Sequence, residues 1–257
     1  MTLEKKHKDL VEIRKLILEL AFSKKEGHIG SSFSITEILY VYWKFFSKSN
    51  HFVLSKGHAA IGIYSVLYKL KIISKKDFFS FCEFNSKLGG HPDGNKIKDL
   101  NFSTGSLGHG LPMSVGFALS QHLKKKKSKI FCLLGDQELL EGTTWESLHL
   151  IDYLKIPNMI IIIDKNNSDF RSVTIRNLKN KFNYFNNIDV SEVDGHNISS
   201  LHKLFKNLSQ ISKSQIIVCK TIKGFGIKEM HNNPEWHHKT PTSKEHLHEL
   251  IRKIDIR

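Results

Sequence analysis

The stretch IFCLLGDQELLEGTTWESLHLIDYLKIPNMIIIIDKNN, residues 130–167, decides the fold class. It begins with the apolar run Ile130–Leu134 and closes on a second apolar run, Met159–Ile163, and each run is followed directly by polar residues. Short continuous apolar runs are typical of strands that are buried on both faces of a parallel sheet. The segment between them, Thr143–Leu154, has the length and residue types of a helix. Strand, helix and strand at this spacing predict a βαβ unit.

The rest of the chain shows the same alternation. Further strands are predicted at Phe52–Leu54 and Gln215–Cys219, and helices at Asp9–Phe22, Phe33–Phe46, His58–Leu70 and Leu111–Leu123. No internal repeat or linker marks a boundary, so residues 1–257 are expected to form a single domain. The predicted fold is α/β, with a parallel central sheet and helices on both faces.

Composition excludes several classes of protein. The chain has 257 residues, of which 40% are hydrophobic and 25% charged, as in an ordinary globular protein. The net charge of +14 comes mainly from lysines spread along the chain, and only Lys124–Lys127 forms a basic run, so no nucleic-acid partner is expected. The three cysteines are isolated, which argues against a zinc site or a disulfide framework. Isolated cysteines of this kind make the reducing cytosol the expected compartment. The longest apolar run is too short to cross a bilayer.

Two strand ends carry candidate metal ligands. Gly135-Asp136 follows the first strand of the βαβ unit, and Asn166-Asn167 lies just beyond the second. Neighbouring parallel strands would bring Asp136 and Asn166 together at the carboxyl edge of the sheet, where ligands bind. A carboxylate and an amide oxygen suit Mg²⁺ or Ca²⁺ that also binds phosphate oxygens. The alternative is structural, with Asp136 capping a helix and the asparagines forming a turn.

Histidines and glycines recur together elsewhere in the chain. His28, His58, His91 and His109 each follow a glycine, which places imidazoles where backbone can approach a ligand closely. The small residues Ser103–Gly110 precede a predicted helix and could contact a flat ligand, although a plain turn explains them equally well. The acidic residues Glu138, Glu141 and Glu146 lie near the start of the next helix, and for Glu138 an interaction with the helix dipole is the simpler interpretation.

These segments together resemble the transketolase family, and specifically the N-terminal, thiamine-diphosphate-binding half of its split form, which is made as two polypeptides. The resemblance is carried by EGHIGSSFSITEILYVYW (26–43), HFVLSKGHAAIGIYSVL (51–67), GGHPDG (89–94), STGSLGHGLPMSVGFAL (103–119), LLGDQELLEGTTWESL (133–148), IIIIDKNN (160–167), VDGHN (193–197), KTIKGFGI (220–227) and NNPEWHHKTP (232–241). Their order and spacing match the family from end to end.

The resemblance implies a role for each matching residue. It implies that Mg²⁺ is bound by Asp136, Asn166 and the backbone carbonyl of Ser168. It implies that the cofactor is contacted by residues of several loops, namely His58, Gly105, Ser106, Leu107, Gly135, Asp136, Gln137, Asn166 and His237. His28 and His91 would face the reacting carbon and the sugar hydroxyls. Glu141 and Glu146 would lie at a subunit interface and couple two active sites.

The sequence departs from the family at a few positions. Gln137 stands where the family usually has glycine, which adds a side chain beside the cofactor diphosphate. Ile29 replaces a common proline, and Ser168 replaces an apolar residue.

The resemblance also implies a missing half. A complete transketolase is roughly twice this length, so the chain would act only with a separate C-terminal subunit, as an α₂β₂ assembly. The implied reaction moves a two-carbon ketol unit from a ketose or ketose phosphate to an aldose or aldose phosphate. Two alternatives stay open: a non-catalytic scaffold or regulatory subunit that keeps the fold, and a related thiamine-dependent enzyme with another donor, such as a deoxyxylulose phosphate synthase.

Overall fold

The structure is a computed structural model that describes residues 3–97, 99–100, 102–166, 178–208 and 211–256. These residues form a five-stranded parallel sheet with the strand order β1-β2-β3-β5-β4. The strands are β1 (His51–Leu54), β2 (Ile130–Gly135), β3 (Met159–Lys165), β4 (Ile188–Asp194) and β5 (Ser214–Lys220). The predicted α/β class is confirmed, and the βαβ unit is formed by β2, the helix α7 (Gly142–Tyr153) and β3.

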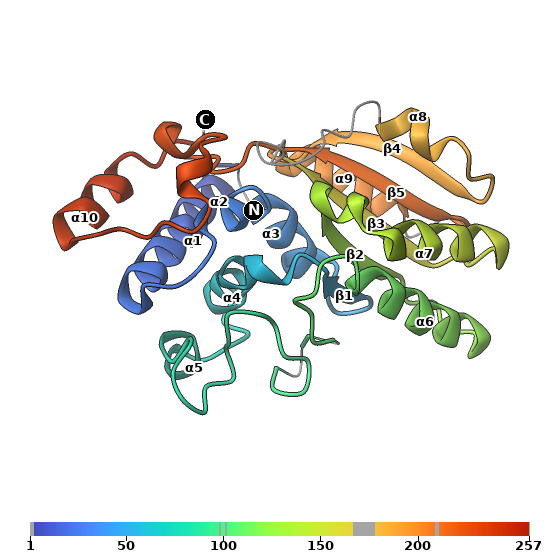
Figure 1. Ribbon diagram of the computed structural model, residues 1–257, viewed down its shortest axis with the longest axis horizontal. Helices are drawn as coiled ribbons and strands as arrows, with labels where there is room; N and C mark the ends of the chain where they lie inside the picture. Colours follow the sequence, from blue (N-terminus) through green and yellow to red (C-terminus); the bar gives the residue numbers. More distant parts are fainter. Residues whose placement is uncertain (1–2, 98, 101, 167–177, 209–210, 257) are drawn as a thin grey trace.

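Helices cover both faces of this sheet (Figure 1). The remaining α-helices are α1 (Leu3–Lys24), α2 (Ile29–Phe33), α3 (Thr36–Phe45), α4 (Ala60–Lys69), α5 (Lys75–Phe79), α6 (Gly110–Leu123), α8 (Leu178–Phe182), α9 (Ile198–Leu208) and α10 (Lys244–Arg252). Short 3₁₀ helices are η1 (Gly57–Ala59), η2 (Asp136–Leu140), η4 (Lys228–Met230) and η5 (Pro234–Trp236). Within the described segments, every helix is too short or too polar to span a bilayer.

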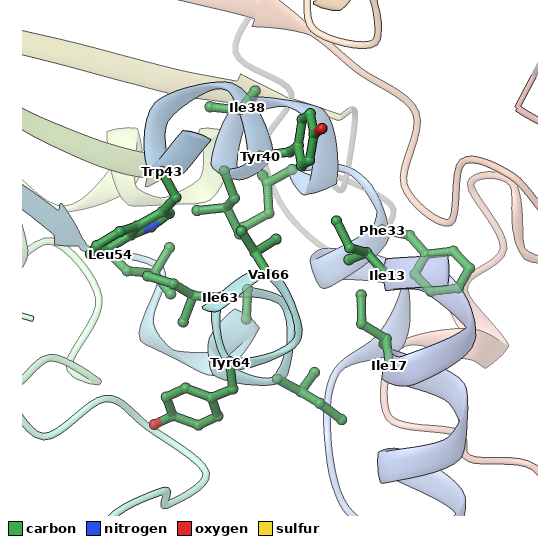
Figure 2. Close-up of a cluster of buried hydrophobic side chains, with 14 of the residues drawn as sticks. Ile13, Ile17, Phe33, Ile38, Tyr40, Trp43, Leu54, Ile63, Tyr64 and Val66 are labelled. Atoms are coloured by element: carbon green, nitrogen blue, oxygen red, sulfur yellow. The ribbon is translucent and has the colours of Figure 1, made fainter. Parts of the chain in front are cut away.

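The strands divide the interior into two hydrophobic cores because successive side chains point to opposite faces. Phe131 and Leu133 of β2 face the larger core, which contains residues of α1, α3, α4 and α9. Cys132 and Leu134 face the smaller core under α6, α7 and α8. Figure 2 shows part of the larger core, where Ile13 of α1 lies among buried side chains of neighbouring helices. Both faces of the central strands are therefore buried, as their apolar sequences predict.

The predicted helix Phe33–Phe46 is wrong in one respect, because it is broken into α2 and α3 around Ser34. The Ser34 hydroxyl donates to the buried Asp164 carboxylate (2.8 Å), and the Ser31 carbonyl is a second acceptor within reach of the same proton (3.0 Å). Serine side chains compete with helical backbone bonds in this way. One strand and several helices of the described residues are additional to the predicted set, namely β4, α5, α8, α9 and α10.

Candidate active site at the carboxyl edge of the sheet

A cavity of about 350 Å³ lies at the carboxyl ends of the strands. Segments that follow β1, β2, β3 and β5 all contribute to it, together with the N-terminal end of α2. Its lining consists of His28, Ser31, Lys56, His58, His91, Gly105, Leu107, Gly135, Asp136, Gln137, Glu138, Asn166, Lys223 and His237. The position is the one at which open parallel sheets bind ligands.

The turn after β1 is held tightly against the segment that contains Gly105. Thr104 donates its hydroxyl to the Leu54 carbonyl (2.6 Å), and a Cβ atom at Gly57 would lie 3.0 Å from the Gly105 nitrogen. Glycine at position 57 is therefore required by close packing. This contact places the neighbouring His58 and the backbone of Gly105 on one wall of the cavity.

Two side chains with hard oxygen atoms lie together at the strand ends, where the sequence places them. Gly135 pairs with Asp164 across β2 and β3, so Asp136 and Asn166 follow adjacent strand ends and line the same cavity. Asp136 is 7% exposed and Asn166 is 2% exposed. Among the described residues, no group of three or more histidine, cysteine and acidic side chains could hold a metal ion. Any metal here needs further oxygen ligands, and the predicted third ligand, Ser168, lies outside the described residues.

A buried ion pair lies directly beneath this edge of the sheet and contacts Asn166. Lys56, 1% exposed, pairs with the fully buried Asp164 and also donates to the Ser31 carbonyl (3.2 Å). Burial alone would raise the pKa of Asp164, but the Lys56 ammonium and hydrogen bonds from Lys56, Thr221 and Ser34 hold that pKa below its ordinary value. The same carboxylate accepts from Asn166 Nδ2 (2.7 Å), which fixes the orientation of the Asn166 amide.

The carboxylate of Glu138 holds together three of the segments that form the cavity. Its buried carboxylate accepts from the amides of Gly108 (3.0 Å) and Gly135 (2.8 Å) and from the Ser55 hydroxyl. Burial raises the pKa of Glu138, although these donors oppose the shift. Glu138 does lie in the first turn of a helix, η2, and caps its N-terminus through the Gly135 amide, as the sequence predicts. Its carboxylate has a further role, because it also joins the turns after β1 and β2 to the segment that precedes α6.

Several imidazoles gather on one side of the cavity. The ring of His28 lies edge-on to those of His58 (5.1 Å between centroids), His237 (5.3 Å) and His238 (4.7 Å). Burial, together with His238 and His237, lowers the pKa of His28 to about 4, and burial with Lys56 lowers the pKa of His58. Both rings are therefore neutral at physiological pH and can accept a proton or a hydrogen bond.

The lowered pKa of His28 predicts a loss of stability in acid. Between the ordinary histidine pKa of ~6.5 and about 4, the unfolded chain binds a proton at His28 and the folded chain does not. The free energy of unfolding therefore falls as the pH falls through this window. We expect His28→Asn to reduce this pH dependence in denaturant unfolding, whereas His149→Asn, on the exposed surface of α7, serves as the control. An unchanged slope in His28→Asn would contradict the assignment.

Lysine supplies the positive charge of the cavity. Lys223, 5% exposed, lies in the segment after β5, and its Nζ atom lies 3.0 Å from Nδ1 of His237. Lys56 and Lys223 are therefore two buried lysines that line the cavity. A Cβ atom added at Gly135 would have Cβ of Lys56 as its nearest neighbour, at 3.9 Å, so the backbone there faces space rather than packed protein. Oxygen ligands, two ammonium groups and accessible backbone suit a polyanion bound with a divalent metal.

Most predicted site residues line this cavity, and three described ones lie apart from its lining. Ser106 lines a neighbouring surface hollow, where its hydroxyl lies 3.3 Å from Nδ1 of the exposed His109. Glu141 is the N-cap residue of α7 and lies beside Gly108, since a Cβ at that glycine would be 2.5 Å from Cβ of Glu141. Glu146 is exposed on α7.

Sequence reasoning missed three buried residues of the site. Lys56 and Lys223 line the cavity, and Asp164 orients Asn166. The sequence contains a signal for two of these residues. Lys56 directly precedes Gly57-His58, and Asp164 follows the run of isoleucines in β3. A charged residue that continues a buried strand needs a partner, which is the signal that identifies such a pair.

Comparisons with known proteins agree with this geometry. Residues 6–255 match the family described as "Transketolase, thiamine diphosphate binding domain". A protein from Actinobacillus succinogenes, named as one of the subunits of an apulose-4-phosphate transketolase, is 34% identical over 95% of this chain and 92% of its own length. The protein of the same name from Phocaeicola vulgatus is 29% identical, with the same two coverages.

The fold is also that of a solved structure. Transketolase from Campylobacter jejuni superposes with a TM-score of 0.84 at 24% identity, over 100% of this chain. The present chain spans 44% of that transketolase. The prediction of a thiamine-diphosphate-binding transketolase subunit is confirmed by the family match and by the names of the relatives. The chain therefore belongs to the transketolase family, in which it corresponds to the thiamine diphosphate binding domain.

Proposed function

We propose that residues 1–257 act as a single cofactor-binding domain, the first subunit of a two-component transketolase. The subunit would take part in moving a two-carbon ketol unit from a ketose or ketose phosphate to an aldose or aldose phosphate. One observation carries the proposal: the side chains of Asp136 and Asn166, two buried lysines and several imidazoles line one cavity at the carboxyl edge of the sheet. That set of groups fits a diphosphate with its metal.

The residues divide into three groups by what they would hold. Asp136 and Asn166, with the carbonyl of Ser168, would bind Mg²⁺ or Ca²⁺. The diphosphate would be contacted by groups on both sides of the cavity, namely Lys56, His58, Gly135, Gln137, Lys223 and His237. Gly105, Ser106 and Leu107 would lie along the rings of the cofactor. When bound, thiamine diphosphate supplies the nucleophilic carbon for ketol transfer.

His28 and His91 would serve the sugar. Both line the cavity, and the lowered pKa of His28 keeps its ring neutral, so the ring can accept a hydrogen bond or a proton from a sugar hydroxyl. The relatives named for apulose 4-phosphate make that ketose phosphate the first donor to test.

A separate C-terminal subunit would complete the site. Apolar side chains are exposed beside the cavity at Leu107 (38%) and Leu140 (45%), and farther along α7 at Tyr153 (82%). We take these side chains as candidates for the interface, and the naming of the two relatives as one subunit of their enzymes supports a partner. We place Glu141 and Glu146 in this interface, the assembly as α₂β₂, and the protein in the cytoplasm, with neither nucleic acid nor membrane as a partner.

The proposal predicts that activity depends on the partner. We expect the chain alone to show no turnover of apulose 4-phosphate with an aldose phosphate acceptor, and the mixture with its C-terminal chain to be active. Calorimetric titration of thiamine diphosphate with Mg²⁺ should show saturable binding that tightens when the partner is added. Turnover by the purified chain alone would contradict the two-component scheme, and absence of binding to the assembled complex would contradict the cofactor role.

A further inference from the structure

The segment that carries Lys223 is held in place at two points. On one side of Lys223, the Ile222 amide donates to Nε2 of His196 (2.9 Å). On the other side, Nε of Arg14 donates to the Phe225 carbonyl (2.8 Å). These two bonds fix the backbone on both flanks of a side chain that reaches the cavity.

Both holding residues are joined by one buried carboxylate. Glu37 of α3 accepts a hydrogen bond from Nη2 of Arg14 of α1 (3.0 Å) and forms an ion pair with the same nitrogen (2.8 Å). It also lies 3.1 Å from Nδ1 of His196, in the turn between β4 and α9. Arg14 and Glu37 are both fully buried. The cation beside it holds the pKa of Glu37 below its ordinary value despite burial. We call Arg14, Glu37 and His196 the buried triad.

The hydrogen bonds assign the tautomer of His196. A backbone amide can only donate, so Nε2 of His196 must be unprotonated, and Nδ1 therefore carries the proton and donates to Glu37. The His196 ring is also stacked on Phe225, with centroids 3.7 Å apart and planes at 17°. Orientation and tautomer are thus both set, and each ring nitrogen has a different task.

The position of this segment determines where the Lys223 ammonium lies. The Gly224 amide donates to the Gly30 carbonyl (3.0 Å), and a Cβ at Gly30 would lie 3.3 Å from Cγ of Lys223. Gly224 has φ +79°, and a Cβ there would lie 2.4 Å from the Met230 carbonyl oxygen, so a side chain at this position is excluded. Lys223 therefore crosses over α2 in a narrow passage, and its ammonium reaches His237 at 3.0 Å.

We propose that the buried triad is a positioning device for cofactor binding, which acts through the Ile222–Phe225 backbone to place Lys223 against His237. Arg14, Glu37 and His196 are separate from the described residues that line the cavity. The inference rests on the proposed function, because Lys223 and His237 are taken there to contact the diphosphate. Arg14, Glu37 and His196 are therefore positioning residues.

Two substitutions separate the tasks of the His196 nitrogens. His196→Gln retains an oxygen near the place of Nε2, which can accept from the Ile222 amide. His196→Asn retains a donor near Nδ1 for Glu37 but is too short to reach Ile222. The measurement is calorimetric titration of thiamine diphosphate, in excess Mg²⁺, into the complex with the C-terminal chain. Thermal unfolding of each variant shows whether it folds, and His202→Asn on α9 is the matched control.

We expect His196→Asn to weaken cofactor binding about 10-fold, the lower end for supporting residues of metal sites, and His196→Gln to retain most of the affinity. In a Lys223→Met background, His196→Asn should add little further loss, because the triad acts through Lys223. Equal effects of Asn and Gln, or full additivity with Lys223→Met, would overturn the positioning role while leaving the proposed function intact. Wild-type complex that binds no thiamine diphosphate would instead overturn both.

Discussion

Asp136→Ala is expected to weaken the binding of thiamine diphosphate with Mg²⁺ by about 100-fold or more, since even supporting residues of metal sites contribute roughly 10- to 100-fold. Asp136 is 7% exposed at the end of β2 and shares the cavity with Asn166. Without its carboxylate, the metal would lose its one anionic protein ligand among the predicted set. Calorimetric titration of the assembled complex, with the metal varied at fixed cofactor, measures the effect.

The control for this substitution is Asp189→Ala. Asp189 lies near the start of β4, at the opposite edge of the sheet, and its side chain is 54% exposed. This variant should bind cofactor as the wild type does. If Asp136→Ala binds with unchanged affinity while remaining folded, then the metal is held elsewhere and the assignment of this strand end is wrong.

The central sheet could be predicted because its strands are buried on both faces. The run of isoleucines in β3 predicts a buried strand, and the length of chain between β2 and β3 predicts a crossover helix. β4 was not predictable in this way, because it is an edge strand in which Asp189 and Glu192 interrupt the apolar pattern. The break between α2 and α3 depends on a hydrogen bond from Ser34 to Asp164, 130 residues away, which local periodicity does not contain.

The residues that we propose to bind a ligand directly could be predicted from the sequence, whereas most of the residues that support them could not. Asp136 and Asn166 are identified by their places after strands and by the family resemblance. Glu138 and Asp164 act through partners that are distant in sequence, so their roles appear only when the chain is folded. The local sequence indicates at most that a charge in a buried strand needs a partner, and it does not identify that partner, because a buried carboxylate is defined by its donors rather than by its neighbours in the chain.

The second large effect is expected at the buried pair of Lys56 and Asp164. Removing either partner leaves an uncompensated charge inside the protein, so Lys56→Met and Asp164→Asn should each lower the free energy of unfolding by about 3–5 kcal/mol. The double variant should recover a large part of this loss, because it removes both charges. Urea unfolding of the wild type, both single variants and the double variant gives the coupling energy.

The control is the same set of single and double variants at an exposed ion pair. Lys213 and Asp189 form such a pair, in which the charged atoms are 4.0 Å apart and both side chains are about half exposed. Its coupling should stay within about 1 kcal/mol, since water screens both charges. A coupling at Lys56 and Asp164 no larger than this would show that the pair is not desolvated. The double variant separates stability from function, because it should fold and yet bind thiamine diphosphate weakly. Methionine at position 56 removes a positive charge from the cavity wall. Asparagine at position 164 removes the ionised carboxylate that orients the Asn166 amide.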